Sequence, residues 1–263
     1  VYGMKAAAGV ILVTTKRGTE GKTTINYKGS LTLSHATTLP EFMNGTHYMQ
    51  WYNYARRMDG EKAYFTDEEI AMTTNGDPTD GFENTNWQEP IYRTTLMHQH
   101  NLSISGGNEK TRYYLSGGFM KQNGFIKGFE LERGNFRSHI DTQVTKDISV
   151  SLNVAGKIND YYQPGGDSYE NQTTNNVVGV LLYAAPFVPL EYEGMPASGY
   201  RGASNPDYAA GHSGYSKIRT MRLETSAKIE YSFPFLKGLK AGMFVGWDWQ
   251  DRDSRSFKYS YEL

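Results

Sequence analysis

Cysteine is absent from the 263 residues, which excludes disulfide bonds and thiolate metal sites. No apolar run approaches the roughly twenty residues that a transmembrane helix needs. Lysine and arginine total 27 against 28 aspartate and glutamate residues, so the net charge of -1 offers no basic field to attract nucleic acid. The opening residues Val1 to Met4 lack the charged region of a leader peptide, and we expect the sequence to be part of a longer protein.

Glycine and aromatic residues are abundant. The chain contains 28 glycines and 20 tyrosines, and aromatic residues make up 14% of it. Glycine is the usual residue of tight turns, and tyrosine suits a pleated surface that is half buried. The composition therefore indicates an all-β protein with many turns.

The stretch 135–158 has the clearest periodicity. Phe136, Ile140 and Val144 alternate with polar residues such as Arg137 and His139, and a second alternating run follows after a few residues. Side chains alternate between the two faces of a strand, so each run has one apolar and one polar face. The short gap between the runs predicts an antiparallel hairpin. Similar runs occur near residues 25–33, 100–104, 113–119, 223–231, 239–249 and 257–261.

The length and spacing of these runs favour a membrane barrel. The two runs of the hairpin are about ten to thirteen residues long, whereas soluble strands cluster near 5–6 and barrel strands need roughly 9–11. Short and long connections alternate, as expected when turns lie on one membrane side and loops on the other. Aromatic residues fall at both edges of the apolar band, as in the two aromatic girdles of a barrel: Tyr113, Tyr231 and Phe233 at one edge, and Phe119, Phe136, Trp247 and Trp249 at the other.

Two alternatives stay open on this evidence. A soluble all-β carbohydrate-binding or adhesive module would bury the same apolar faces inside a sandwich. A β-rich hydrolase would need a pair of carboxylates that converge in a cleft. The environment of the apolar faces separates the first alternative from a barrel.

Two long connections carry helix signals. Asn44 or Thr46 is suited to cap a helix with an aromatic stripe, and Thr66 followed by Glu69 has the spacing of a capping box. In the second connection an apolar helix over residues 177–185 is expected to end at Pro186. We therefore predict short helices within the long loops.

Several segments resemble the SusC/RagA family of TonB-dependent outer-membrane transporters. The segment that ends in Lys16-Arg17-Gly18 is similar to the end of the family's plug domain. Four further segments resemble the start of its barrel: Asn86-Trp87, residues 99–107, residues 113–118 and Asn135-Phe136-Arg137. Departures are small, with Met4-Lys5, Ala8 and Gly134 where the family usually carries other residues.

The resemblance implies a 22-stranded barrel that encloses a plug. Residues 1–20 would be the C-terminal end of the plug, and residues 21–263 would be the N-terminal portion of the barrel, with about eight strands. The implied function is import of oligosaccharides or peptides across the outer membrane. The implied partners are a SusD-like surface lipoprotein, outer-membrane lipid and TonB, which would contact a segment outside this sequence.

Two sets of residues are candidates for function, and no residue is predicted to be catalytic or to bind a metal or cofactor. His98 and His100 share a strand face but have no third ligand nearby. Polar residues on the face opposite the apolar one are predicted to line the lumen, mainly to hold the plug and secondarily to contact substrate: Arg112, Arg137, His139, Asp141, Lys157, Arg222, Glu224, Lys228 and Glu230. Aromatic residues of the first long loop are predicted to stack on a ligand: Trp51, Tyr52, Tyr54, Trp87 and Tyr92.

Overall fold

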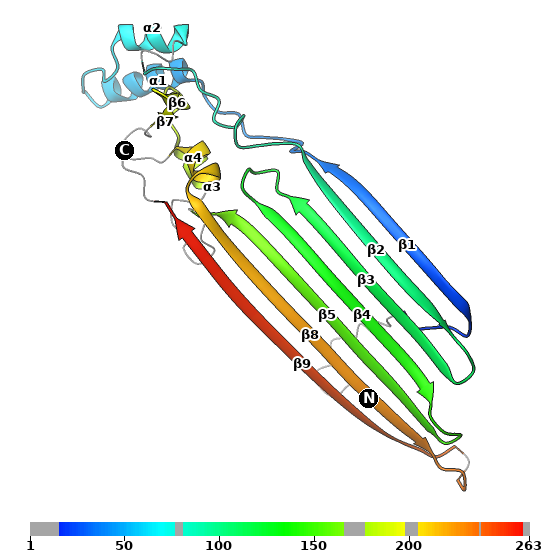
Figure 1. Cartoon of the computed structure of the whole chain (residues 1–263). Coiled ribbons are helices and arrows are strands. Elements are labelled where there is room, and N and C mark those ends of the chain that lie inside the picture. The colour runs from blue at the N-terminus through cyan, green and yellow to red at the C-terminus, as the bar shows by residue number, and fades with distance from the viewer. Residues whose placement is uncertain (1–15, 77–80, 166–176, 198–204, 237, 260–263) are drawn as a thin grey trace.

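One antiparallel sheet of seven long strands dominates the structure, a computed structural model that describes residues 16–76, 81–165, 177–197, 205–236 and 238–259. The strand order is β1-β2-β3-β4-β5-β8-β9, so strands adjacent in the sheet follow one another along the chain (Figure 1). The strands are β1 (Gly21–Ser34), β2 (Thr95–Gly107), β3 (Thr111–Asn123), β4 (Glu130–Gln143), β5 (Ile148–Pro164), β8 (Gly214–Ser232) and β9 (Lys240–Lys258). The predicted all-β fold is confirmed.

The strand count differs from the prediction of about eight. The sequence predicted a separate strand near Phe257, Tyr259 and Tyr261, but Phe257 lies within β9, opposite Tyr215 of β8. No glycine or proline interrupts the charged stretch 251–255, so β9 stays hydrogen-bonded to β8 through it. Tyr261 lies outside the described residues.

Short turns join the strands at one end of the sheet, and the long connections lie at the other (Figure 1). The β2–β3 turn is closed by Asn108, whose side-chain oxygen accepts hydrogen bonds from the backbone of Lys110 and Thr111 at 2.9 and 2.8 Å. Gly107, just before it, has a φ of +155° that a larger residue would adopt with strain. Local turn chemistry therefore fixes the register of this hairpin.

The long connections contain the helices α1 (Gly45–Met58), α2 (Asp67–Asn75), α3 (Val177–Tyr183) and α4 (Pro206–Gly211), and the small hairpin of β6 (Glu191–Tyr192) and β7 (Met195–Pro196). Asn44 caps α1, and Thr66 and Glu69 form the predicted capping box of α2. None of the helices that the structure describes is long and apolar enough to span a membrane. We call these elements and the segments that join them the loop assembly.

The buried apolar core lies in the loop assembly and not in the sheet. Trp87 and Ile91 pack with α3 and α4, and Met49 and Phe65 pack with Phe187. No apolar side chain of the seven long strands belongs to the buried core of the described residues. The apolar face of the sheet is therefore not covered by a second sheet, which argues against the soluble sandwich.

Candidate functional site

The register of the sheet places all nine predicted lumen residues on one face, which we call the polar face. Arg112 is opposite Asp141, and Lys157 is opposite Arg222, so these side chains point to the same side. The nine predicted residues on this face are Arg112, Arg137, His139, Asp141, Lys157, Arg222, Glu224, Lys228 and Glu230. The common face follows from the pairing, while their role in lining a lumen stays a prediction.

Near the turns, the polar face carries a closed hydrogen-bond network. His139 is 2% exposed, with Nε2 at 2.8 Å from Asp141 Oδ2 and Nδ1 at 2.5 Å from Asn153 Oδ1. The Ser151 hydroxyl donates to the other carboxylate oxygen of Asp141 at 2.5 Å, and the Asn153 amide donates to Ser226 at 3.3 Å. Because its ring is buried and both nitrogens are engaged, His139 ties β4 to β5 and does not present itself to a ligand.

The other predicted residues near the turns are also paired. Lys228 contacts Glu230, and Arg112 lies 3.5 Å from Glu20. Exposed ion pairs of this kind add little stability, because water and salt screen the attraction. They nevertheless satisfy their own charges, so this half of the polar face presents few free charges.

Farther from the turns, the polar face contains a hollow of about 530 Å³ in which cations predominate. Arg222 donates to Gln250 Oε1 at 2.6 Å and lies 3.9 Å from the Glu224 carboxylate. Arg137 and Lys157 line the same hollow. The site is therefore basic and open, which suits a ligand or a plug surface that carries negative charge.

The segment Lys16–Glu20 lies against this face. Gly18 is buried, and a Cβ atom on it would come within 2.4 Å of the backbone of Tyr113 in β3. Only glycine permits so close an approach to a strand. Lys16 lines the basic hollow. The remainder of the predicted plug tail, residues 1–15, lies outside the described residues.

The opposite face carries a largely apolar surface, which we call the apolar belt. Many of its side chains are well exposed, with Leu152 at 40%, Val245 at 54% and Trp247 at 55%. Across the middle strands it consists of Leu115, Phe119, Phe136, Val150, Leu152, Val154, Ile158, Met221, Leu223, Ile229, Met243, Val245, Trp247 and Trp249. A continuous exposed apolar patch of this size marks contact with a partner or with lipid.

A row of charges, most of them paired, borders the apolar belt on the side of the loop assembly, and we call it the charged row. Arg219 forms a bidentate pair with Asp160, at 2.7 and 2.6 Å, and Lys121 contacts Glu130 and Glu132, each at 2.8 Å. Its members are Lys121, Glu130, Glu132, Asp160, Lys217, Arg219, Asp251, Asp253 and Arg255. The belt therefore ends abruptly, at one level on neighbouring strands.

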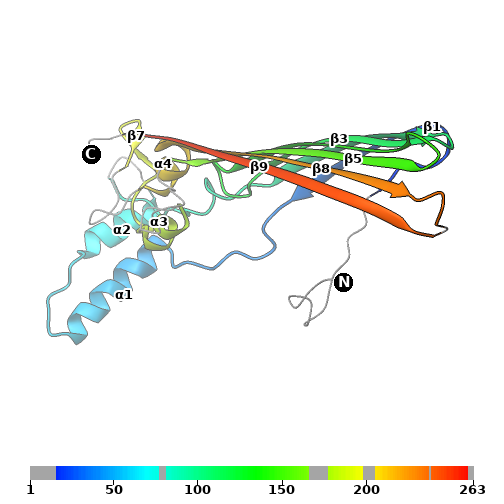
Figure 2. The ribbon, with the colours of Figure 1, turned by 90° about the horizontal axis from the view of Figure 1, so that it is seen from below.

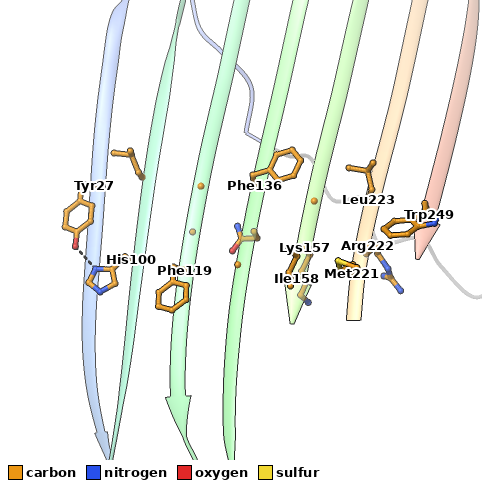
Figure 3. Close-up of a pocket in the computed structure, with 16 residues that line it drawn as sticks. Tyr27, His100, Phe119, Phe136, Lys157, Ile158, Met221, Arg222, Leu223 and Trp249 are labelled. Carbon is orange, nitrogen blue, oxygen red and sulfur yellow. Dashed lines mark hydrogen bonds between the residues drawn. The ribbon is translucent and has the colours of Figure 1, made fainter. Parts of the chain in front are cut away.

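Figure 3 shows a shallow hollow of about 760 Å³ within the belt. Phe119, Phe136 and Trp249 stand around it, and Gly117 and Gly134 leave its floor open because nothing lies within 4 Å of a Cβ built on either. Its polar contact at one end is a 2.6 Å hydrogen bond between Tyr27 and His100. It shares lining residues with the basic hollow, because both are formed by the same strands: Asn135, Phe136, Gly156, Lys157 and Arg222.

The predicted stacking aromatics divide into exposed and packed residues. Trp51 and Tyr54 of α1 are 58% and 52% exposed and meet edge to face at 5.5 Å between ring centroids. Trp87 is 5% exposed, and its indole nitrogen donates to the Ala185 carbonyl at 2.9 Å. Its ring belongs mainly to the core between the two long loops, so it offers less free surface than Trp51 and Tyr54, and its role as a ligand contact stays a prediction.

The two remaining aromatics are partly packed. Tyr52 contacts the rings of Tyr48, Tyr64 and Phe65, and Tyr92 stacks on Phe125 at 6.0 Å. Both have rings that already touch neighbours, so they offer less free surface than Trp51 and Tyr54. Their role as ligand contacts stays a prediction.

Comparison with known proteins gives a consistent result. No family model matches the chain. It is 31% identical over 156 residues to TonB-dependent receptor P3 of Formosa agariphila, which covers 59% of this chain and 14% of that protein. It is 25% identical over 276 aligned residues to TonB-dependent receptor SusC of Bacteroides thetaiotaomicron, which covers 95% of this chain and 25% of SusC.

Solved structures agree on the fold. The RagAB peptide transporter matches 96% of this chain and 31% of its own chain with a TM-score of 0.74 at 19% identity. The RagAB peptide importer in its closed-closed state matches 97% of this chain and 31% of its own with a TM-score of 0.71 at 18% identity. This chain is similar in sequence to TonB-dependent receptors, SusC among them, and similar in fold to RagAB. It spans 14% to 25% of the length of these two curated relatives.

Several residues of the polar face were missed by the sequence analysis. Lys28, Arg133 and Arg252 share this face with the predicted set, as do Asn101 and Asn135. The alternation within β1 and β9 already placed Lys28 and Arg252 opposite the apolar residues, and that signal was sufficient to find them. Among the residues with assigned positions, no group of three or more side chains is arranged to hold a metal ion.

Proposed function

We propose that the full-length protein is a TonB-driven importer of the outer membrane that takes up oligosaccharides or peptides together with a SusD-like surface lipoprotein. The observation that carries the proposal is the seven-stranded sheet with one exposed apolar belt and one polar face. A sheet with lipid on one side and a hydrated lumen on the other needs this division. The named relatives are receptors and the named structures are transporters or importers, which supports import over catalysis.

The height of the apolar belt fits a bilayer. On β5 it runs from Ile148 to Ile158, beyond which Asp160 belongs to the charged row. At about 3.4 Å per residue this is roughly 34 Å along the strand, or about 24 Å across the membrane at a tilt near 45°. Membrane barrels carry an apolar band about 25 Å tall. The charged row would then lie at the level of the lipid headgroups.

The loop assembly is suited to meet substrate and partner outside the cell. In Figure 2, α1 and α2 stand away from the plane of the sheet on the side where the dark blue segment before β1 lies. In a closed barrel this is the side of the lumen, so the exposed pair Trp51 and Tyr54 would lie near the lumen mouth. A SusD-like lipoprotein would cover the same end, and TonB would act from the other membrane side.

The test is uptake by the full-length protein in its own membrane. We expect the protein in the outer-membrane fraction, extractable only with detergent, and we expect import of its substrate to stop when TonB is deleted. Deletion of a neighbouring gene for a surface lipoprotein should reduce import in the same assay. A full-length protein that stays in solution without detergent would instead support the soluble all-β module and overturn the proposal.

Trp51 and Tyr54 provide a test of substrate contact. Replacing each with alanine should weaken substrate binding about 2- to 12-fold for each ring, because an aromatic contact contributes about 0.5–1.5 kcal/mol. The control is Phe235→Ala in the β8–β9 turn, which removes a ring that is 74% exposed at the opposite end of the sheet. Calorimetric titration of the purified transporter measures the affinities, and equal affinities for all three variants and the parent would contradict the role.

A further inference from the structure

Two adjacent rows across the polar face contain cations and amides but no acid. The register aligns Lys28, Asn101, Gly118, Asn135, Lys157, Arg222 and Gln250 in one row. The next row toward the loop assembly contains Ser30, Gln99, Met120, Arg133, Asn159, Thr220 and Arg252. We call these the two cationic rows.

Carboxylates at this end of the sheet lie on the opposite face. From the cationic rows to the ends of the seven strands, the polar face of the strands carries no aspartate or glutamate. The acidic residues at that end belong to the charged row: Glu130, Glu132, Asp160, Asp251 and Asp253. The two faces of the same strand ends therefore differ sharply in charge.

The cations of the rows have neutral partners or none. Arg133 donates to Asn159 Oδ1 at 3.0 Å, and Arg222 donates to Gln250 Oε1 at 2.6 Å. Arg222 has one distant acid, Glu224 at 3.9 Å in the row below. Within the described part of the chain, Lys28, Lys157 and Arg252 form no ion pair. On the charged row, by contrast, Lys121, Lys217, Arg219 and Arg255 all contact a carboxylate.

The centre of the first row is arranged to receive an anion. Lys157 and Arg222 are directly opposite each other, a like-charge pairing that is unfavourable unless an anion lies between or above them. Beside them, the oxygens of Asn101 and Asn135 converge over Gly118, where a Cβ would lie 2.7 and 2.8 Å from them. Cations bind carboxylates, and side-chain amides both donate to and accept from hydroxyl groups.

We propose that the two cationic rows form the binding surface for an acidic oligosaccharide, with Lys157 and Arg222 on its carboxylates and Asn101 and Asn135 on its hydroxyls. The inference rests on the proposed function, because it assigns a substrate class to that importer. An oligosaccharide fits better than an acidic peptide, since each sugar offers hydroxyls to the amides. The exposed rings of Trp51 and Tyr54 lie at the same end of the sheet and can stack on sugar faces.

The experiment compares three ligands on the purified full-length transporter. The probes are an oligogalacturonate, a neutral galactose oligomer of equal length and an acidic peptide of the same charge as the oligogalacturonate. The double variant Lys157→Gln, Arg222→Gln should weaken oligogalacturonate binding about 10- to 100-fold, because each charged hydrogen bond is lost, and should change binding of the neutral sugar less than about twofold. Raising the salt concentration should weaken oligogalacturonate binding by the parent protein and affect the variant less.

The control variant is Arg255→Gln, which removes one cation at the same end of the sheet but on the opposite face, where it is paired with Asp253. It should leave the affinities for both sugars unchanged. Equal loss for both sugars, no loss for either, or a loss confined to an acidic peptide of the same charge would overturn the assignment. A rise in membrane permeability with unchanged affinities would also overturn it, since the rows would then hold the plug.

Failure of the inference and failure of the proposed function give different results. Outer-membrane location and TonB-dependent uptake of any substrate are measured on the parent protein in parallel. If the parent protein is located in the outer membrane and takes up substrate, but the variant binds the two sugars with equal loss, only the proposed substrate class is wrong. If location or uptake fails, the proposal that the protein is an importer is wrong, whatever the sugar titrations give.

Discussion

Truncation of Trp87 to alanine is expected to lower the free energy of unfolding of the loop assembly by about 3–5 kcal/mol. The ring is 5% exposed and packs with Ile91, Val177 and Leu181, so its removal leaves a cavity between the two long loops. The substitution also leaves the Ala185 carbonyl without its donor, which adds a desolvation cost. The effect should stay local, because the strands contribute no side chain to this core.

Native-state proteolysis of the full-length protein measures this change. Cleavage within the loop assembly should accelerate in the Trp87→Ala variant, while the seven-stranded sheet keeps its resistance to protease. The matched control is Trp51→Ala in the same connection, whose ring is 58% exposed and whose loss should change stability by less than about 0.5 kcal/mol. Comparable cleavage rates for the two variants would show that Trp87 is not a core residue.

Substitution of Val245 by arginine is expected to destabilise the protein by about 2–4 kcal/mol, whereas the same change at its neighbour Phe244 should have a small effect. Val245 is 54% exposed near the middle of the apolar belt, and Phe244 is 69% exposed on the polar face. Arginine in the middle of a lipid-facing surface carries a cost of this size, and arginine facing a hydrated lumen does not. The two positions differ mainly in the face they occupy.

Folding of the full-length protein into lipid vesicles with a denaturant titration gives both free energies. The comparison is sensitive because both parent side chains are apolar and exposed, so a protein with water on both faces would tolerate both arginines equally. Such equality, or a larger effect at Phe244, would contradict the assignment of the apolar belt to lipid.

The faces of the strands could be predicted from the sequence, because alternation is a local property. Each of Arg137, Lys157 and Glu224 lies on the polar face as predicted. The alignment of one strand with another could not be predicted where long connections intervene. Lys157 and Arg222 are separated by the connection between β5 and β8, so nothing in the sequence indicated that they stand opposite each other.

Which side chains of the loop assembly are buried also could not be predicted from the sequence. Trp87 and Trp51 belong to the same connection, and both are aromatic residues in a polar setting. What distinguishes them is the hydrogen bond from the Trp87 indole to the Ala185 carbonyl, and Ala185 belongs to a different connection. His139 is a similar case, since its face was predicted but its enclosure by Asp141 and Asn153 depends on two strands at once.

The two long loops share one core, and this has a consequence for how such receptors diversify. Backbone hydrogen bonds join Glu83 to Phe187 and Thr85 to Pro186, at 3.0 and 2.8 Å. The first loop is therefore held in place by residues that lie about a hundred positions later in the sequence. Neither loop can be exchanged between relatives without leaving half of a hydrophobic interior behind. Recombination that grafts a new specificity onto this scaffold must therefore carry both loops, with β2 to β5 between them, as a single inherited block.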